Sequence, residues 1–150
     1  MIDEKDMEIL RALKEDSKSS INALSKKTGI PPATVHHRIR KMEQDKVIKR
    51  YSISVDKEKI GFPIGAYIFI TVKPSGEHRL DQRAIADKLA RHEFVEEATV
   101  LTGEIDMMLK VRVRTMNDLD KFVLDYLRNF EGVERTRTLI SLYASKGLHV

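Results

Sequence analysis

The chain has 150 residues, of which 41% are hydrophobic and 33% charged, with 27 basic and 23 acidic side chains. This composition allows a packed core and argues against disorder. The absence of cysteine excludes structural disulfides, cysteine–zinc sites and thiol nucleophiles. The longest uncharged run, residues 60–72, is 13 residues long, whereas a transmembrane helix needs about 20. Because the acidic amino terminus lacks the basic and apolar regions of a secretory signal, we expect a cytoplasmic protein.

Positive charge is concentrated in the first third of the chain. Residues 17–50 hold 9 basic and 2 acidic side chains, a net charge of +7, whereas residues 51–150 hold 15 of each kind. Such a cationic segment is typical of a protein that binds a polyanion. A solvated lysine-rich face is the alternative, and charge alone does not decide between the two.

The first fifty residues have the apolar periodicity of three short helices. Asp3 and Ser20 are positioned to cap the first and second helices, and Gly29 ends the second. Pro31 and Pro32 suit the start of a third helix, because the N–H that proline lacks has no helical partner there. A short helix, a tight glycine turn and a longer basic helix form the pattern of a helix-turn-helix.

The third helix has a polar face opposite its apolar stripe of Val35, Ile39 and Met42. The short, polar or cationic residues on that face and its flanks are Ala33, Thr34, His36, His37, Arg40, Lys41 and Gln44. Groups of this kind near the start of a helix can enter a major groove and reach base edges. The alternative is that this face is simply exposed to solvent and has no binding function. Arg38 lies beside the apolar stripe, and we expect it to pair with an acidic residue of the first helix.

After the third helix the periodicity changes to two, which predicts an extended segment over residues 47–55. Lys46, Lys49 and Arg50 lie where a winged variant would place its wing. We therefore assign residues 1–52 to a winged helix-turn-helix domain and residues 53–64 to a strand or hinge connector. The rest of the chain, residues 65–150, forms a second domain.

This second domain alternates strands and helices in the order β-α-β-β-α-β. The strands are predicted over residues 66–72, 95–102, 107–114 and 133–144, and the helices over residues 80–91 and 115–130. The predicted fold class is α+β, with an N-terminal winged helix-turn-helix joined to a C-terminal ferredoxin-like βαββαβ domain.

Nothing in the sequence indicates catalysis. There is no phosphate loop, dinucleotide glycine fingerprint or nucleophile elbow. His36 and His37 point about 100° apart on a helix, so they do not converge on one metal ion. The Gly-Glu-Ile-Asp of residues 103–106 is more typical of a hairpin turn than of a site. We expect no enzyme, no metal and no cofactor.

The chain resembles the Lrp/AsnC (feast/famine) family of prokaryotic transcriptional regulators over almost its whole length. Residues 20–30 and 38–42 resemble the family's helix-turn-helix signature, and residues 47–51 resemble its wing. Two positions depart from the pattern. Pro31 replaces the usual serine or threonine cap of the recognition helix, at a cost of about 1 kcal/mol that Pro32 partly offsets. Lys46 replaces a glycine, at a position where we expect positive φ.

The resemblance implies a sequence-specific DNA-binding regulator. Phosphate contacts would come from Lys26, Lys27, Lys46, Lys49 and Arg50, and the outward residues of the third helix would lie near base edges. It also implies a small effector, often an amino acid, bound where dimers meet by Thr102, Gly103, Asp106, Thr136 and Thr138. Asp106 would receive the α-ammonium group, and backbone N–H groups and hydroxyls would receive the carboxylate. The chain would form a homodimer and a higher homo-oligomer, from tetramer to octamer.

Two other functions stay open at this point. The chain could be a small-molecule-sensing module that regulates a partner protein without binding DNA. Binding of single-stranded RNA through the sheet would require exposed aromatic residues on adjacent strands. Tyr67 and Phe69 lie on one predicted strand, but the later strands hold no matching aromatic residues.

Overall fold

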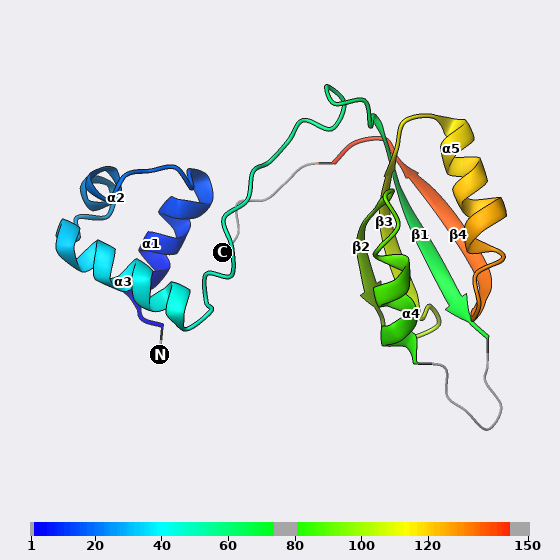
Figure 1. Cartoon of the computed structure of the whole chain (residues 1–150), viewed down its shortest axis with the longest axis horizontal. Helices are drawn as coiled ribbons and strands as arrows, with labels where there is room; N and C mark the ends of the chain where they lie inside the picture. Colours follow the sequence, from blue (N-terminus) through cyan, green and yellow to red (C-terminus); the bar gives the residue numbers. More distant parts are fainter. Residues whose placement is uncertain (1, 74–80, 145–150) are drawn as a thin grey trace. The chain divides into compact units, whose positions relative to one another are not determined.

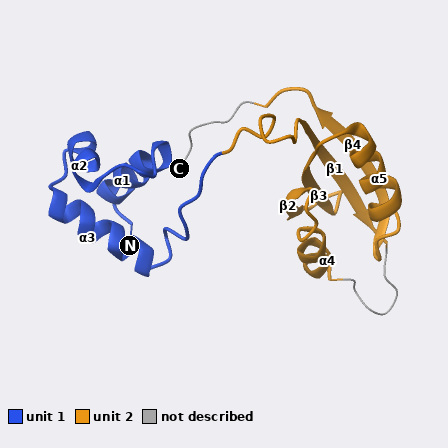
Figure 2. Cartoon of the chain, turned by 45° about the horizontal axis from the view of Figure 1, so that its top comes forward, with its two compact units in different colours: residues 1–54, 145–150 blue, residues 55–144 orange. Residues whose placement is uncertain are grey.

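The computed structural model describes residues 2–73 and 81–144. They form two compact units that divide between Ser54 and Val55 (Figure 2). The first unit holds three helices, and the second holds a four-stranded sheet with its own helices (Figure 1). The turn expected at residues 74–76, the start of the helix expected at residue 80 and the last residues, 145–150, lie outside the described residues.

The helices of the first unit are α1 (Glu4–Glu15), α2 (Ile21–Thr28) and α3 (Pro32–Gln44). Both predicted caps are confirmed. The Asp3 and Asp6 side chains each accept from the other's backbone N–H, at 2.9 and 3.0 Å, and Ser20 Oγ accepts from the Ala23 N–H at 3.1 Å. Gly29 ends α2 with a φ of 70°. The core of this unit consists of Ile9, Ala12, Leu13, Leu24, Ile30, Val35, Ile39 and Met42.

The predicted extended segment over residues 47–55 is not a β-strand in the structure. The chain instead reverses after α3, because Lys46 adopts a left-handed φ of 55°. The Lys46 N–H donates to the Glu43 carbonyl oxygen, and the Val47 N–H donates to that of Met42. This is the Schellman motif that normally uses glycine. The strand prediction was wrong. Alternation of apolar and polar residues shows that a segment can form a strand, but a strand also needs a neighbouring strand to pair with. No described residue of the chain pairs with residues 47–55.

The second unit is an antiparallel sheet of β1 (Ile64–Val72), β2 (Val95–Val100), β3 (Met107–Val113) and β4 (Val133–Ser141) in the order β2-β3-β1-β4. Helix α4 (Gln82–Leu89) follows β1 and α5 (Met116–Lys121) follows β3. This is the predicted βαββαβ order. The helix after β3 continues as a π-helical turn over Phe122–Leu127, which the sequence pattern does not predict.

The two helices cover the same face of the sheet. Ala66, Ile68 and Ile70 of β1 alternate into that face, together with every second residue of β3 from Met107 to Val113. The helices contribute Ile85, Ala86, Leu89, Leu119, Phe122 and Leu127. The other face, which we call the open face, carries Tyr67 and Phe69 of β1, and no described helix covers it (Figure 1). Since one face of the sheet is buried and the other is half-exposed, strand alternation alone assigns each side chain to a face.

Candidate functional site

The outward face of α3 is the first candidate site. Val35, Ile39 and Met42 are buried, at 0%, 8% and 2% exposure, and they fix the orientation of the helix on α1 and α2. The opposite side presents Ala33, His36, His37, Arg40 and Lys41 to solvent, with Thr34 half-buried at its margin. All the residues predicted to lie near base edges therefore come from one helix and, apart from Thr34, are exposed.

The start of α3 adds a second feature to this face. Pro31 has φ −55° and ψ 142°, and no side chain caps the helix there. A helix amino terminus carries a partial positive charge and N–H groups that favour a phosphate oxygen. The predicted loss of the cap is confirmed. Because Pro31 and Pro32 have no N–H, only the N–H groups of Ala33 and Thr34 remain for an anion at this end.

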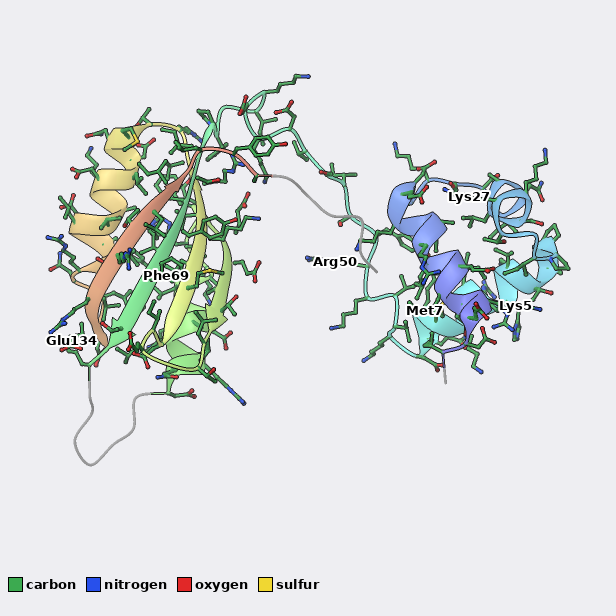
Figure 3. All side chains as sticks on the ribbon, turned by 180° about the vertical axis from the view of Figure 1, so that it is seen from behind. Lys5, Met7, Lys27, Arg50, Phe69 and Glu134 are labelled. Carbon is green, nitrogen blue, oxygen red and sulfur yellow. The ribbon has the colours of Figure 1, made fainter. Side chains whose placement is uncertain are left out.

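Basic side chains flank α3 on both sides in the sequence. Lys26 and Lys27 occupy the last turn of α2, and Lys46, Lys49 and Arg50 follow α3; all five are exposed. Lys27 forms an ion pair with Glu15 (Figure 3 labels Lys27 and Arg50). Both members of that pair are half-exposed, so the pair is weak and can exchange for a phosphate.

Arg38 has a structural role, as expected. Its Nη1 donates to Asp3 Oδ2 at 2.7 Å and to Asp6 Oδ1 at 2.8 Å, which ties α3 to the first turn of α1. The pKa of Asp3 is held below its usual value by the hydrogen bond from the Asp6 backbone N–H and then by Arg38. Arg38 is therefore a part of the scaffold that orients α3.

Tyr51 is a residue that sequence reasoning missed. Its hydroxyl donates to Glu43 Oε1 at 2.8 Å, which fastens the basic segment after α3 back onto the helix. Partial burial and the Glu43 carboxylate raise the pKa of Tyr51 to about 12. The sequence feature that could have indicated this contact is Glu43, which is one of only two acidic residues among residues 17–50.

The loop between β2 and β3 is the second candidate site, and it forms the predicted turn. Thr102 and Gly103 are exposed at its tip, and Gly103 has a φ of 112°. Asp106 fastens the loop to its surroundings. Its Oδ2 accepts from the Val72 N–H and its Oδ1 from Gln82 Nε2, both at 2.8 Å, while its own N–H donates to the Ile70 carbonyl oxygen.

Thr136 and Thr138 lie on a different strand from this loop. They pair with Ile70 and Ile68 of β1, so their half-buried side chains lie on the helix-covered face. Asp106 precedes β3 and donates its N–H to Ile70, whereas Thr136 pairs with Ile70 from β4, on the other side of β1. The two residues are thus separated by two strand spacings, roughly 10 Å, and the chain places them at the same end of the sheet.

Two further residues at this end escaped the sequence analysis. Gln82, the first residue of α4, donates to Asp106, and no pattern links positions 24 residues apart. Thr71 Oγ1 is buried and has no hydrogen-bond partner among the described residues. By strand alternation Thr71 lies on the open face with Phe69, whereas Thr136 and Thr138 lie on the helix-covered face, so Thr71 does not add to their group.

The described ranges, 2–73 and 81–144, contain no cluster of three or more His, Asp or Glu side chains able to hold an ion. Within the same ranges no helix has the length and apolar character that crossing a membrane requires.

Comparison with known proteins connects both candidate sites to families. Residues 2–49 match the model of a winged helix-turn-helix DNA-binding domain, and residues 66–147 match that of the Lrp/AsnC ligand binding domain. An uncharacterized HTH-type transcriptional regulator of Pyrococcus horikoshii is 34% identical over 97% of this chain and 96% of its own length.

Solved structures agree. AsnC of E. coli superposes with a TM-score of 0.84 at 27% identity, over 100% of this chain and 98% of its own. A transcriptional regulator from Neisseria meningitidis, solved as a complex with L-Met, has a TM-score of 0.88 at 24% identity, over 98% and 94% of the two chains.

Proposed function

The chain belongs to the Lrp/AsnC family and is a transcriptional regulator rather than an enzyme, and we propose that α3 recognises specific sequences of double-stranded DNA. The observation that carries the proposal is the exposed polar and cationic side of α3, flanked by basic residues on the α2 side and on the segment after α3. A role at DNA also agrees with the cytoplasmic location expected from the sequence.

We assign two kinds of contact to this surface. Lys26, Lys27, Lys46, Lys49 and Arg50 bind phosphates and supply affinity without sequence information. Ala33, Thr34, His36, His37, Arg40 and Lys41 lie near base edges. Of these, Arg40 carries a guanidinium group, which can form a bidentate hydrogen bond to guanine.

A titration of labelled duplexes tests DNA binding directly. The protein is titrated against genomic fragments and random duplex at several salt concentrations, and we expect binding to both at low salt and to a subset of fragments at physiological salt. A protein that ignores duplex DNA at low salt would contradict the proposal. It would then favour the alternative, a small-molecule sensor that regulates a partner protein.

We also propose that two chains pair through their open faces and connectors. In this arrangement residues 1–52 are the DNA-binding domain, residues 53–64 the connector and residues 65–150 the domain for effector binding and oligomerisation. Residues 47–55 keep strand alternation without a partner in the described chain, which a second copy would supply. A dimer presents two recognition helices to half-sites about 34 Å apart, or a multiple of this. Higher assembly, from tetramer to octamer, is tested by sedimentation.

For the ligand-binding domain we propose a small effector such as an amino acid. Thr102, Gly103 and Asp106 on the loop, with Thr136 and Thr138 on β4, form its site. A carboxylate has about four acceptor positions, so Asp106 can receive an α-ammonium group while it keeps Val72 and Gln82. That a protein of the same fold was solved with L-Met supports this class of ligand.

The effect of such a ligand is limited by thermodynamics. It can shift assembly only by the difference between its affinities for the two assembly states. Thermal unfolding of the protein with each of the twenty amino acids, followed by sedimentation with those that raise Tm, tests for an effector. If none of them changes Tm or assembly, the amino-acid proposal is contradicted.

A further inference from the structure

The open face carries opposite charges at its two edges. On the β2 edge lies Glu97, and on the β4 edge lie Arg135 and Arg137. Cross-strand pairing places these residues in rows. One row runs from β2 to β4 through Thr99, Met108, Phe69 and Arg137 (Figure 3 labels Phe69). The next consists of Glu97, Lys110, Tyr67 and Leu139. Glu96 lies in the bulge between Val95 and Glu97, outside the rows, and it pairs with Lys57 and Lys110 at 3.5 and 3.6 Å.

The middle of the open face is apolar, and its cations are engaged within the chain. Lys110 pairs with Glu96 at 3.6 Å. Arg112 lies across Gly65, where a Cβ would come within 3.3 Å of its Nε, and donates to the Phe62 and Pro63 carbonyl oxygens. The two central strands therefore offer Tyr67, Phe69 and Met108 between the charged edges.

The arginines of the β4 edge are available for an outside partner. Arg135 and Arg137 are exposed, and within the described residues neither forms an ion pair. Glu134 lies in the bulge where the register with β1 shifts between Thr71 and Val72, so it is outside the rows (Figure 3). On the β2 edge, Glu97 is exposed and accepts only a local hydrogen bond, from Thr99 Oγ1 at 2.9 Å.

Symmetry limits how two such faces can meet. A homodimer has a two-fold axis, and two sheets packed face to face keep their strands nearly aligned. If the axis runs along the strands, each β4 edge covers the partner's β2 edge. If it runs across them, β4 covers β4 and β2 covers β2. The second arrangement places arginine on arginine and glutamate on glutamate, and such like-charge contacts disfavour pairing.

We propose that these charged edges select the first arrangement and restrict pairing to chains with the same edge pattern. The inference rests on the proposed pairing of open faces and adds its orientation and its selectivity. In a cell with several chains of this fold, an edge of the wrong sign would meet a like charge in a mixed pair. Selectivity then comes from repulsion as much as from attraction.

Charge exchange between the edges tests the proposal in the full-length chain. A half-exchanged chain carries Arg135→Glu and Arg137→Glu, and a fully exchanged chain adds Glu97→Lys. We expect the half-exchanged chain to self-associate about ten-fold more weakly or worse. The fully exchanged chain recovers self-association to within about three-fold of the parent, and mixed with the parent it forms fewer mixed pairs than random exchange would give.

The control for charge alone is a chain with Arg83→Glu and Arg128→Glu, which has the same charge change as the half-exchanged chain. These two exposed positions lie on α4 and directly after the helical turn that ends at Leu127, away from the open face. This control chain should self-associate like the parent. Recovery in the fully exchanged chain also shows that the substituted edges still fold. Sedimentation gives the self-association constants, and native mass spectrometry of tagged and untagged chains counts the mixed pairs.

The outcomes separate this inference from the proposal beneath it. If the parent chain does not self-associate, the pairing of open faces fails and the inference fails with it. If the parent self-associates but the fully exchanged chain pairs with it as readily as with itself, only the charge selection is overturned. A preference of the fully exchanged chain for the parent would show the arrangement with β4 on β4.

Discussion

The Arg38 guanidinium donates to the Asp6 carboxylate at 2.8 Å and thereby joins α3 to the first turn of α1. Asp6 is the one buried charged residue among those described, at 7% exposure. If Arg38 is removed, the buried negative charge of Asp6 loses the cation that offsets its desolvation. The loss of stability is then larger than the net stabilisation that the ion pair provides. Arg38 thus fixes the direction of α3 without contributing to its outward face.

Substitution of Arg38 by Ala should therefore lower the Tm of the first unit by several degrees and weaken binding to all duplexes. Arg40→Ala, two residues away on the exposed side, is the matched control and should leave Tm unchanged. Circular dichroism melts at neutral pH measure both variants. An unchanged Tm for Arg38→Ala would show that the Arg38–Asp6 contact does not stabilise this unit.

The division between base and phosphate contacts makes a separate prediction. Arg40→Ala should lose discrimination between a specific and a random duplex, by about 1–3 kcal/mol. Lys49→Ala should weaken binding to both duplexes alike and reduce the slope of log K against log salt by about 1. Titrations at several salt concentrations measure both quantities. Equal losses from both variants on both duplexes would contradict this assignment of contacts.

The left-handed Lys46 predicts opposite effects on stability and on binding. Glycine adopts φ 55° without the Cβ clash that lysine has there, so Lys46→Gly should stabilise the first unit by about 0.5–1 kcal/mol. It should also weaken DNA binding, because a charge is lost. Lys46→Asn, which removes the charge but tolerates this φ, is the matched control for binding. A destabilised Lys46→Gly chain in urea unfolding would rule out backbone strain at this position.

Local rules predicted the caps at Asp3 and Ser20, the glycine turn at Gly29 and the Arg38 pair, because each depends on neighbours in sequence or on one helix period. The order of strands and helices in the second unit followed from periodicity in the same way. The prediction of a strand over residues 47–55 was wrong, because a strand forms only where another segment pairs with it.

The candidate sites show the same limit. Helical geometry was sufficient to select the outward residues of α3, since burial of Val35 and Ile39 determines the opposite side. By contrast, the contact of Gln82 with Asp106 joins residues 24 positions apart through tertiary packing. The Tyr51–Glu43 hydrogen bond likewise depends on the reversal at Lys46, and no periodic pattern encodes that contact.

His92 predicts a pH dependence for the second unit. Its ring packs against Phe122 and Tyr126 with centroids 4.6 Å apart, and its Nδ1 accepts from the Phe94 N–H at 3.2 Å. Burial lowers the pKa of His92 below its usual 6.5. The unfolded chain therefore takes up the proton first, so stability is complete above pH 6.5 and falls as the pH drops through the folded-state pKa.

Unfolding midpoints of the parent and of His92→Phe between pH 8 and pH 5 measure this contribution. Phenylalanine keeps the aromatic contacts and cannot be protonated, so the variant should lose less stability over this range. His36→Phe, on the exposed side of α3, is the control and should keep the parent's pH dependence. Identical curves for parent and His92→Phe would exclude His92 as the source.

Asp106 gives the last prediction, in which ligand response and loop stability can be separated. Asp106→Asn keeps an oxygen that can accept from Val72 or Gln82 but removes the charge that an α-ammonium group requires. With an amino acid that raises the parent's Tm as the probe, we expect this variant to lose most of the Tm shift and to bind half-sites normally. Gln82→Leu keeps the charge and removes one hydrogen bond, so it should weaken the shift without abolishing it. If Asp106→Asn responds to the amino acid like the parent, the ligand is not held by this carboxylate.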